Sequence, residues 1–156
     1  MAIEKVRKHL EQFGKATDIL EFESSSATVD LAAKLLNVEP AEIAKTLSFR
    51  DGDSALLVVA SGDAKVDNAK FKNTFGFKAR MLNADEVLAF TGHEVGGVCP
   101  FGIEKPLKIY LDASIKRFDF IYPGCGSPNA MIKLSIKEMW EYANALDWVD
   151  VCKLPT

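Results

Sequence analysis

The sequence predicts a single domain of the α+β (mixed α/β) class, in which helices flank a mixed sheet. The chain has 156 residues, of which 48% are hydrophobic, and this suffices for one core but hardly for two independent ones. Segments with helical spacing of apolar residues alternate with strand-like runs along the whole chain. Hairpins and helical crossovers both join the strands, so we expect a mixed sheet with about six helices and six or seven strands. We treat residues 1–156 as one domain.

The first expected elements are a helix, a strand and a second helix. Apolar residues recur at helical spacing over residues 3–13, and Gly14 then ends the helix. Residues 18–22 are typical of a strand. Thr28 follows a polar run and can cap a helix whose apolar positions fall within residues 29–36.

A short helix is expected near Pro40, followed by a β-hairpin. Proline favours the first turn of a helix, and we place the end of this helix at Lys45. Residues 46–50 and 54–60 are strand-like runs on either side of an Asp-Gly-Asp turn at residues 51–53. Lys45 is therefore expected at a helix-to-strand junction.

The middle of the chain continues the alternation. Asp67 can cap a basic helix that ends at Gly76. A strand is expected over residues 77–82, and Asn83 can cap a further helix that runs through Phe90.

Three more strands are expected beyond a glycine-rich segment, over residues 107–111, 118–122 and 131–134. Ser135 and Glu138 then form an S-x-x-E capping box, which predicts the start of the last helix.

The charge distribution excludes a protein that coats nucleic acid with its whole surface, because the formal net charge is −3. One local basic patch covers residues 65–80, where five basic residues face a single acidic one and three phenylalanines are interleaved. This pattern fits a nucleic-acid contact, and it equally fits an amphipathic helix whose lysines are merely solvated.

The compartment is expected to be the cytoplasm, with no membrane contact. No apolar run reaches the roughly 20 residues of a membrane span, and residues 1–14 lack a secretory segment. Cys99, Cys125 and Cys152 are an odd number with long gaps, which fits neither a disulfide framework nor paired metal ligation. We therefore expect no metal and no cofactor, with a zinc or thiol site built from Cys99 and His93 as the alternative.

Two loops of small residues are candidate ligand sites. Residues 92–102 (GHEVGGVCPFG) hold four glycines and a proline, a composition that can present backbone amides to a carbonyl oxygen or a phosphate. This loop lacks the Gly-Lys-Ser/Thr ending of a Walker A loop and the dinucleotide-binding spacing. In residues 122–129 (YPGCGSPN), Ser127 and Asn129 could orient a polar ligand. An ordinary structural turn is the alternative for both loops.

Four fragments occur in a fixed order along the chain. They are Ala44-Lys45-Thr46-Leu47, Lys65-Val66-Asp67, the run from Thr91-Gly92 to Gly96-Gly97-Val98-Cys99-Pro100-Phe101-Gly102, and Gly126-Ser127-Pro128-Asn129. Their combination resembles the YbaK/prolyl-tRNA synthetase-associated family over nearly the whole chain. The resemblance implies an aminoacyl-tRNA deacylase that acts in trans, on a YbaK-like fold with a central mixed, β-barrel-like sheet. It also implies two partners: the acceptor end of a mischarged tRNA, with tRNA(Pro) as the expected tRNA, and prolyl-tRNA synthetase.

The same resemblance implies roles for particular residues. By position, Lys45 looks like the essential active-site lysine of the family, and Gly96, Gly97 and Pro100 look like its G-x-x-x-P loop, which holds the aminoacyl carbonyl through backbone amides. The candidate substrate-binding residues are Phe22, Thr28, Val98, Cys99, Phe101, Gly126, Ser127 and Asn129, and the candidate tRNA-binding residues are Lys65, Lys70 and Lys72. The candidate amino acids are alanine, serine or threonine, and cysteine. The sequences around Cys99 and Ser127 depart from those of the cysteinyl-tRNA deacylases and argue against cysteine.

No Ser-His-Asp or Cys-His arrangement is evident, so a conventional triad is not expected. An ester to a ribose is already activated, and positioning, one cation and an oxyanion hole are sufficient for its hydrolysis. The hypothesis is that Lys45 anchors the terminal phosphate or sugar while amides around residues 96–100 polarise the ester carbonyl. The neighbouring ribose hydroxyl would then activate the attacking water. The alternatives are a non-catalytic sensor of aminoacyl-tRNA or amino acids, and a zinc or thiol enzyme that uses Cys99 with His93.

Overall fold

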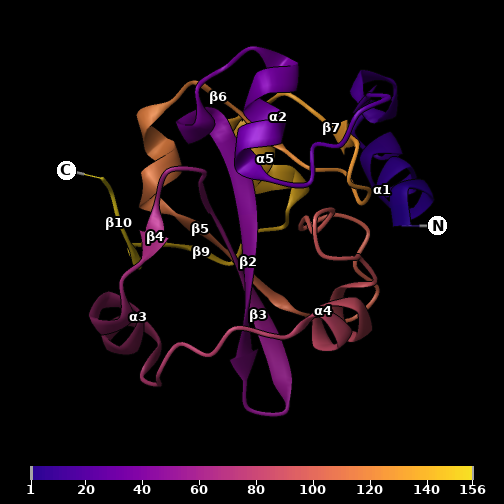
Figure 1. The fold of residues 1–156 in the computed structure, drawn as a ribbon. Coiled ribbons are helices and arrows are strands. Elements are labelled where there is room, and N and C mark those ends of the chain that lie inside the picture. Colours follow the sequence, from indigo (N-terminus) through magenta and orange to yellow (C-terminus); the bar gives the residue numbers. More distant parts are fainter. Residues whose placement is uncertain (1, 156) are drawn as a thin grey trace.

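A six-stranded mixed sheet forms the centre of the computed structural model, which describes residues 2–155 (Figure 1). Its strand order is β8-β6-β2-β3-β5-β9. The strands are β2 (Ile43–Asp51), β3 (Ser54–Ser61), β5 (Lys108–Asp112), β6 (Phe120–Pro123), β8 (Leu134–Ser135) and β9 (Asp147–Val149). The β2–β3 and β6–β8 pairs are antiparallel, and the other three pairs are parallel. The predicted mixed sheet is confirmed.

The sheet is curled into a half-barrel, and the helices lie around it (Figure 1). The helices are α1 (Ala2–Glu11), α2 (Val29–Leu36), α3 (Asn68–Phe75), α4 (Ala84–Thr91) and α5 (Ile136–Tyr142), with 3-10 turns at Ala16–Asp18, Pro40–Glu42 and Ala113–Arg117. Two short ribbons pair β1 (Leu20–Glu21) with β7 (Ala130–Met131) and β4 (Lys65–Val66) with β10 (Cys152–Lys153). None of the helices within residues 2–155 is long and apolar enough to cross a membrane.

The β2–β3 hairpin is the best defined of the predicted elements, and it is confirmed. Asp51 pairs with Ser54, so the loop between the strands has only two residues. Gly52 in that loop has a φ of +60°, which glycine adopts without strain. All of β3 from Ala55 onward is buried, so the hairpin forms the middle of the core.

The predicted N-caps of four helices are also confirmed. The side chains of Thr28, Asp67, Asn83 and Ser135 accept hydrogen bonds from main-chain amides in the first turns of α2, α3, α4 and α5, respectively. At Asn83 and Ser135 a glutamate completes a capping box. These bonds join residues two or three positions apart, so the sequence alone places the helix starts correctly.

The predicted strand over residues 77–82 is wrong. This segment crosses the edge of β2, but only one isolated bridge forms, between Met81 and Phe49. Two hydrogen bonds flank the bridge, from the Arg50 amide to the Arg80 carbonyl and from the Leu82 amide to the Ser48 carbonyl. The apolar residues of this segment do pack on the sheet. A β-strand would require several consecutive residues to pair with β2, and here only one does.

Other boundaries also differ from the prediction. The strand expected over residues 18–22 is limited to β1, and the run over residues 131–134 divides into β7 and β8, which pair with different strands. The helix near Pro40 is a 3-10 turn that ends at Glu42. Because β6 pairs with the start of β2, that strand already begins at Ile43, and Lys45 lies within it instead of at a junction. Strands β4, β9 and β10 were not predicted.

Candidate active site

A cavity of about 250 Å³ opens where the start of α2, the middle of β2 and the glycine-rich loop meet. It is lined by Ser26, Ala27, Thr28, Val29, Ala32, Ile43, Ala44, Lys45, Thr46, Ser48, Met81, Leu82, Val87, Val95, Gly96, Val98, Gly124 and Met131. Four of these residues carry hydroxyl groups and most of the others are apolar. The cavity is therefore small, with a few polar groups in a largely apolar wall, as is usual for small-molecule sites.

The cavity exposes a stretch of β2 that lacks a neighbour. Strand β6 pairs with β2 only at Ile43 and Ala44, and the next contact on that edge is the bridge from Met81 to Phe49. Between these two contacts, no strand pairs with residues 45–48 on this edge in the described part of the chain. Main-chain N–H and C=O groups at such an open edge are available to an extended ligand.

Thr46 has a buried hydroxyl group with no hydrogen-bond partner among residues 2–155. Buried polar atoms in folded proteins are almost always paired, so this exception calls for an explanation. Side chains alternate along a strand, which places Thr46 and Ser48 on one face of β2 and the intervening residues on the other. Thr46 is also one of the lining residues, so its buried hydroxyl lies beside the cavity.

Lys45 also lies in the cavity wall, and its ammonium group reaches the turn that follows β3. The Nζ atom donates a hydrogen bond to the carbonyl of Gly62 at 3.3 Å and another to the carbonyl of Ala64. Burial lowers the pKa of the Lys45 ammonium from its usual value. Two carbonyl oxygens of the turn after β3 thus hold the cation, while Lys45 itself is among the residues that line the cavity.

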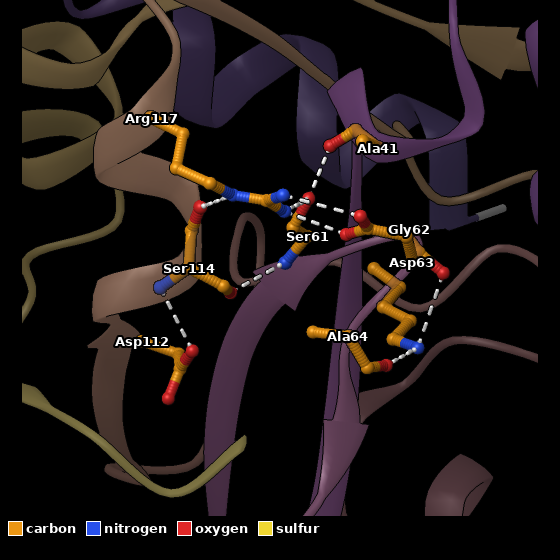
Figure 2. Close-up of polar contacts among 9 residues, drawn as sticks. Ala41, Ser61, Gly62, Asp63, Ala64, Asp112, Ser114 and Arg117 are labelled. Atoms are coloured by element: carbon orange, nitrogen blue, oxygen red, sulfur yellow. Dashed lines mark hydrogen bonds and ion pairs between the residues drawn. The ribbon is translucent and has the colours of Figure 1, made fainter. Parts of the chain in front are cut away.

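An ion pair holds the turn that receives Lys45 (Figure 2). The carboxylate of Asp63 accepts two hydrogen bonds from the Arg117 guanidinium, at 2.6 and 3.1 Å. Arg117 keeps the pKa of the Asp63 carboxyl group below its usual value. The same guanidinium donates to the carbonyl of Ser114 at 2.9 Å and to the hydroxyl of Ser61 at 2.8 Å. Arg117 therefore connects the turn to the end of β3 and to the segment after β5.

Further hydrogen bonds extend this cluster in both directions (Figure 2). The Ser61 amide donates to the Ser114 hydroxyl at 3.0 Å, and the Ser114 amide donates to Asp112 at 2.9 Å. The Ser61 hydroxyl donates to the carbonyl of Ala41. Sequence reasoning missed this cluster because its ion pair joins residues 54 positions apart, and no motif links them.

The glycine-rich loop packs closely against neighbouring backbone. A Cβ atom on Gly97 would lie 2.9 Å from main-chain atoms of Gly126 and Ser127, a distance that real Cβ atoms do not tolerate. Gly96 has a φ of +99°, and a Cβ there would lie 3.0 Å from the Cβ of Ala27. The amide of Gly126 donates to the carbonyl of Gly97 at 3.1 Å. The two small-residue loops are therefore in direct backbone contact, which requires glycine at position 97.

The predicted residues of this loop divide between the cavity wall and the core. Gly96 and Val98 line the cavity, whereas Gly97 and Pro100 are buried and not among its lining residues. The amide of Gly97 already donates to the carbonyl of Glu94 at 2.9 Å. Of the predicted G-x-x-x-P loop, only Gly96 and its neighbour Val98 therefore line the cavity.

Cys99 and His93 lie close together, but in the core. Cys99 is fully buried, with its Sγ 3.6 Å from His93 Nε2, and that nitrogen is 2.7 Å from the carbonyl of Phe101. Burial raises the pKa of the Cys99 thiol to about 12 and lowers that of His93, so both groups are neutral near pH 7. Neither Cys99 nor Phe101 lines the cavity, and within residues 2–155 no three His, Cys, Asp or Glu side chains gather as a metal site would require. Cys99 is therefore not placed or ionised as a thiolate nucleophile would need to be.

The family of the chain follows from comparison with known proteins. The model of the aminoacyl-tRNA editing domain matches residues 23–142, which contain both small-residue loops and Lys45. The chain belongs to the aminoacyl-tRNA editing domain family. The resemblance found in the four sequence fragments is thereby confirmed.

Relatives of this editing domain include free-standing proteins and parts of larger ones. The uncharacterised protein YwhH of Bacillus subtilis is 53% identical over 154 residues, 98% of each chain. A proline–tRNA ligase of Lactobacillus gasseri is 33% identical over 90 residues, which are 57% of this chain and 16% of the ligase. A crystal structure of a candidate trans-editing enzyme for prolyl-tRNA synthetase has a TM-score of 0.87 at 28% identity and covers 97% of both chains. That likeness confirms the expected YbaK-like fold.

The second small-residue loop of the editing domain positions the segment before α2. Asn129 donates from its amide nitrogen to the carbonyl of Phe22 at 2.8 Å and accepts a hydrogen bond from the Ser127 hydroxyl at 2.7 Å. The carbonyl of Pro128 accepts from the Ser26 amide, and Ser26 lines the cavity. Gly126, Ser127 and Asn129 therefore shape the cavity from behind its wall, and Phe22 packs in the small core next to it. Thr28 both caps α2 and lines the cavity.

The predicted tRNA-binding lysines lie on the α3 side of the editing domain and are not among the cavity-lining residues. Lys65 is exposed on β4, and Lys72 is exposed on α3. Lys70 is bound to Asp150 at 3.1 Å and to the carbonyl of Cys152 at 2.9 Å. Their role in tRNA binding stays a prediction.

Proposed function

We propose that this editing domain hydrolyses the ester bond of a mischarged aminoacyl-tRNA in trans. The observation that carries the proposal is a small cavity whose lining includes Lys45 and Thr46, the latter with a hydroxyl that has no hydrogen-bond partner among residues 2–155. Membership of the editing-domain family and the likeness to a candidate trans-editing enzyme support it. The proline–tRNA ligase relatives favour tRNA(Pro) as the carrier of the wrong amino acid.

The chemistry requires few protein groups. Lys45 exchanges one of its two carbonyl partners for the terminal phosphate or sugar of the tRNA and so places the ester in the cavity. The amides of Gly96 and Val98 then donate to the ester carbonyl and stabilise the negative charge that develops on it. Water attacks the carbonyl carbon, the ribose oxygen leaves and takes up a proton, and the products are the free amino acid and the tRNA. Positioning and oxyanion stabilisation each contribute on the order of a hundredfold or more.

The neighbouring ribose hydroxyl serves as the group that activates the water. The two buried candidates for a protein base, His93 and Cys99, do not line the cavity, and burial shifts the pKa of both toward the neutral form. A substrate that lacks this hydroxyl should therefore be hydrolysed far more slowly, by about a hundredfold.

The cavity supports a small amino acid as the substrate. Ala32, Ile43 and Met131 provide apolar contacts, and Thr46 and Ser26 provide hydroxyl groups, within a volume of about 250 Å³. Alanine fits this wall, and serine or threonine would in addition satisfy the hydroxyl of Thr46. A hydrophobic wall separates substrates that differ by one methylene by only about 1 to 3 kcal/mol, so hydrogen bonds to these hydroxyls have to supply the rest of the selectivity.

The test is amino-acid release from a panel of tRNAs charged with alanine, serine, threonine, cysteine and proline. We expect the wild type to release one or two of these amino acids, and we expect Lys45→Ala to lose at least about a hundredfold of that rate. Lys8→Ala, which removes an exposed lysine on α1, is the matched control and should behave as the wild type.

Two results would contradict the proposal. Full activity of Lys45→Ala would remove the lysine from the mechanism. Binding of aminoacyl-tRNA by the wild type without release of any amino acid would instead establish the non-catalytic sensor.

A further inference from the structure

A second concave region lies beside the β2–β3 hairpin. It consists of two adjoining depressions, of about 660 and 280 Å³, and both are lined by Arg50 and Arg80. We call this region the Arg80 cleft. It is lined by Arg50, Gly52, Phe77, Lys78, Ala79, Arg80, Met81, Asn83 and Glu86.

The Arg80 cleft adjoins the active-site cavity. Met81 lines both of them. Along β2, Thr46 in the cavity and Arg50 in the cleft are four residues apart, which corresponds to about 13 Å. The cleft therefore lies within reach of the nucleotides that precede one esterified in the cavity.

The walls of the cleft are cationic although the whole chain has a net charge of −3. Three lining side chains are basic, and the one acidic residue, Glu86, pairs with Arg50 at 3.2 Å. Lys78 and Arg80 are exposed, and neither takes part in an ion pair within residues 2–155. Their positive charges are thus available to an anionic ligand.

An apolar rim separates the cleft from the cavity. Met81 is 58% exposed and Val95 is 64% exposed, and both line the mouth of the cavity. These two exposed side chains give the cavity opening an apolar surface next to the basic cleft. Unstacked bases of a single strand pack on such surfaces, while basic side chains hold the phosphates.

We propose that the Arg80 cleft binds the phosphates of the single-stranded 3′ end of tRNA, which passes over Met81 into the cavity. This inference rests on the proposed function, because it names the surface that delivers the ester to the same site. It adds a binding site to the three lysines on the α3 side, of which Lys70 already has protein partners.

The test is the affinity for uncharged tRNA, labelled at its 5′ end and measured by fluorescence anisotropy over a series of salt concentrations. The variant is Lys78→Ala/Arg80→Ala, in which neither residue has an ion pair whose loss would disturb the fold. The matched control is Lys8→Ala/Lys137→Ala, which removes the same charge from exposed positions on α1 and α5. We expect the first variant to bind about tenfold more weakly, with a salt slope reduced by about 1.5, and the control to bind as the wild type.

A second measurement localises the contact. With tRNA that lacks the single-stranded 3′ end, the difference between the wild type and Lys78→Ala/Arg80→Ala should disappear. Unchanged affinity and salt slope in the variant, or a loss as large with the truncated tRNA, would overturn the inference.

The outcome is separable from that of the proposed function. If the wild type deacylates tRNA and the variant binds tRNA as tightly as the wild type, the proposed function is supported and the tRNA-binding role of the cleft is contradicted. If tRNA binding depends on Lys78 and Arg80 but no amino acid is released, the role of the cleft is supported and the proposed hydrolysis is contradicted.

Discussion

The glycine-rich loop lines the cavity and the Gly62–Ala64 turn binds the ammonium group of Lys45, a lining residue, but the loop and the turn are held in place by different interactions. The loop is fixed by close packing, since Gly97 lies against the backbone of Gly126 and Ser127 with no room for a Cβ. The turn is fixed by charge and hydrogen bonds, through the pair of Asp63 with Arg117. Substitutions that add volume should therefore disturb the loop, which we call the packed half of the site. Substitutions that remove charge should disturb the turn, which we call the polar half.

This difference has a functional logic. Amides that stabilise a developing charge must not move, and dense packing provides that rigidity. In the proposed mechanism, Lys45 exchanges a carbonyl partner for an oxygen of the tRNA. Hydrogen bonds to the carbonyls of the polar turn hold the ammonium group until that exchange occurs. The predictions that follow test each half separately.

The largest effect is expected for Gly97→Ala. The added Cβ meets main-chain atoms at 2.9 Å, so the two loops must separate and the amides of the neighbouring residues move. We expect kcat/KM for deacylation to fall by about a hundredfold or more, and stability to fall by about 1 to 3 kcal/mol.

Gly76→Asn is the control for this substitution. It changes a glycine that has positive φ and lies in open space at the end of α3, where asparagine is tolerated. Equal rates for Gly97→Ala and the control would mean that close packing of the loop does not matter to the reaction.

A smaller effect is expected for Arg117→Ala on the polar half. Without its guanidinium the Gly62–Ala64 turn loosens, and Lys45 loses its fixed position at the cavity margin. We expect KM for the aminoacyl-tRNA to rise about tenfold with a smaller change in kcat, and Arg117→Lys to recover part of the loss. Arg7→Ala, which breaks the ion pair with Glu21, is the matched control. A fall in kcat at unchanged KM would contradict a positioning role.

Thr46→Val should act on function and stability in opposite directions. The hydroxyl has no partner among residues 2–155, so its replacement by a methyl group should increase stability, by about 0.5 to 1 kcal/mol. If the hydroxyl binds the substrate, kcat/KM should fall about fivefold. Thermal unfolding and deacylation rates measure the two effects, and a loss of stability would show that the hydroxyl is paired after all.

The polar half should also depend on pH. Arg117 lowers the pKa of Asp63 in the folded state, so this pair contributes stability above the unfolded-state pKa of about 3.9 and loses it as the pH falls through the folded value. The wild type should therefore exceed Arg117→Ala in stability at pH 7, and the gap should shrink below about pH 4. Denaturant unfolding at both pH values measures the gap, and a constant gap would mean that the charge of Asp63 is not what holds the turn.

The smallest effect is expected from thiol alkylation. Cys99 is fully buried with a pKa raised to about 12, so almost no thiolate is present at pH 8. Treatment of the folded protein with iodoacetamide should leave deacylation unchanged, and the modified fraction of Cys99 can be read by mass spectrometry. Loss of activity in proportion to the modification of Cys99 would support the alternative in which Cys99 acts as a catalytic thiol.

Local features of the sequence were read correctly. The caps at Thr28, Asp67, Asn83 and Ser135 and the β2–β3 hairpin depend on contacts between near neighbours, and all of them are confirmed. The family was also readable, because its four fragments retain their order, and the family match confirms it.

Features that depend on contacts between residues far apart in the sequence could not be predicted from local patterns. The apolar run at residues 77–82 forms only one bridge to β2 and does not become a strand. Lys45 pairs with Ala60 of β3 and therefore lies within a strand. Cys99 and Phe101 belong to the right loop, but only packing decides that they face the core and that Gly96 and Val98 face the cavity.

By itself, the sequence determined the class of fold, the helix starts, the central hairpin and the family, because each depends on residues close together or on a preserved order of motifs. Only the tertiary structure decided which of the candidate residues surround one cavity. It also joined Asp63 to Arg117 and Arg50 to Arg80, because contacts across many residues of chain form only when the sheet brings separate segments together.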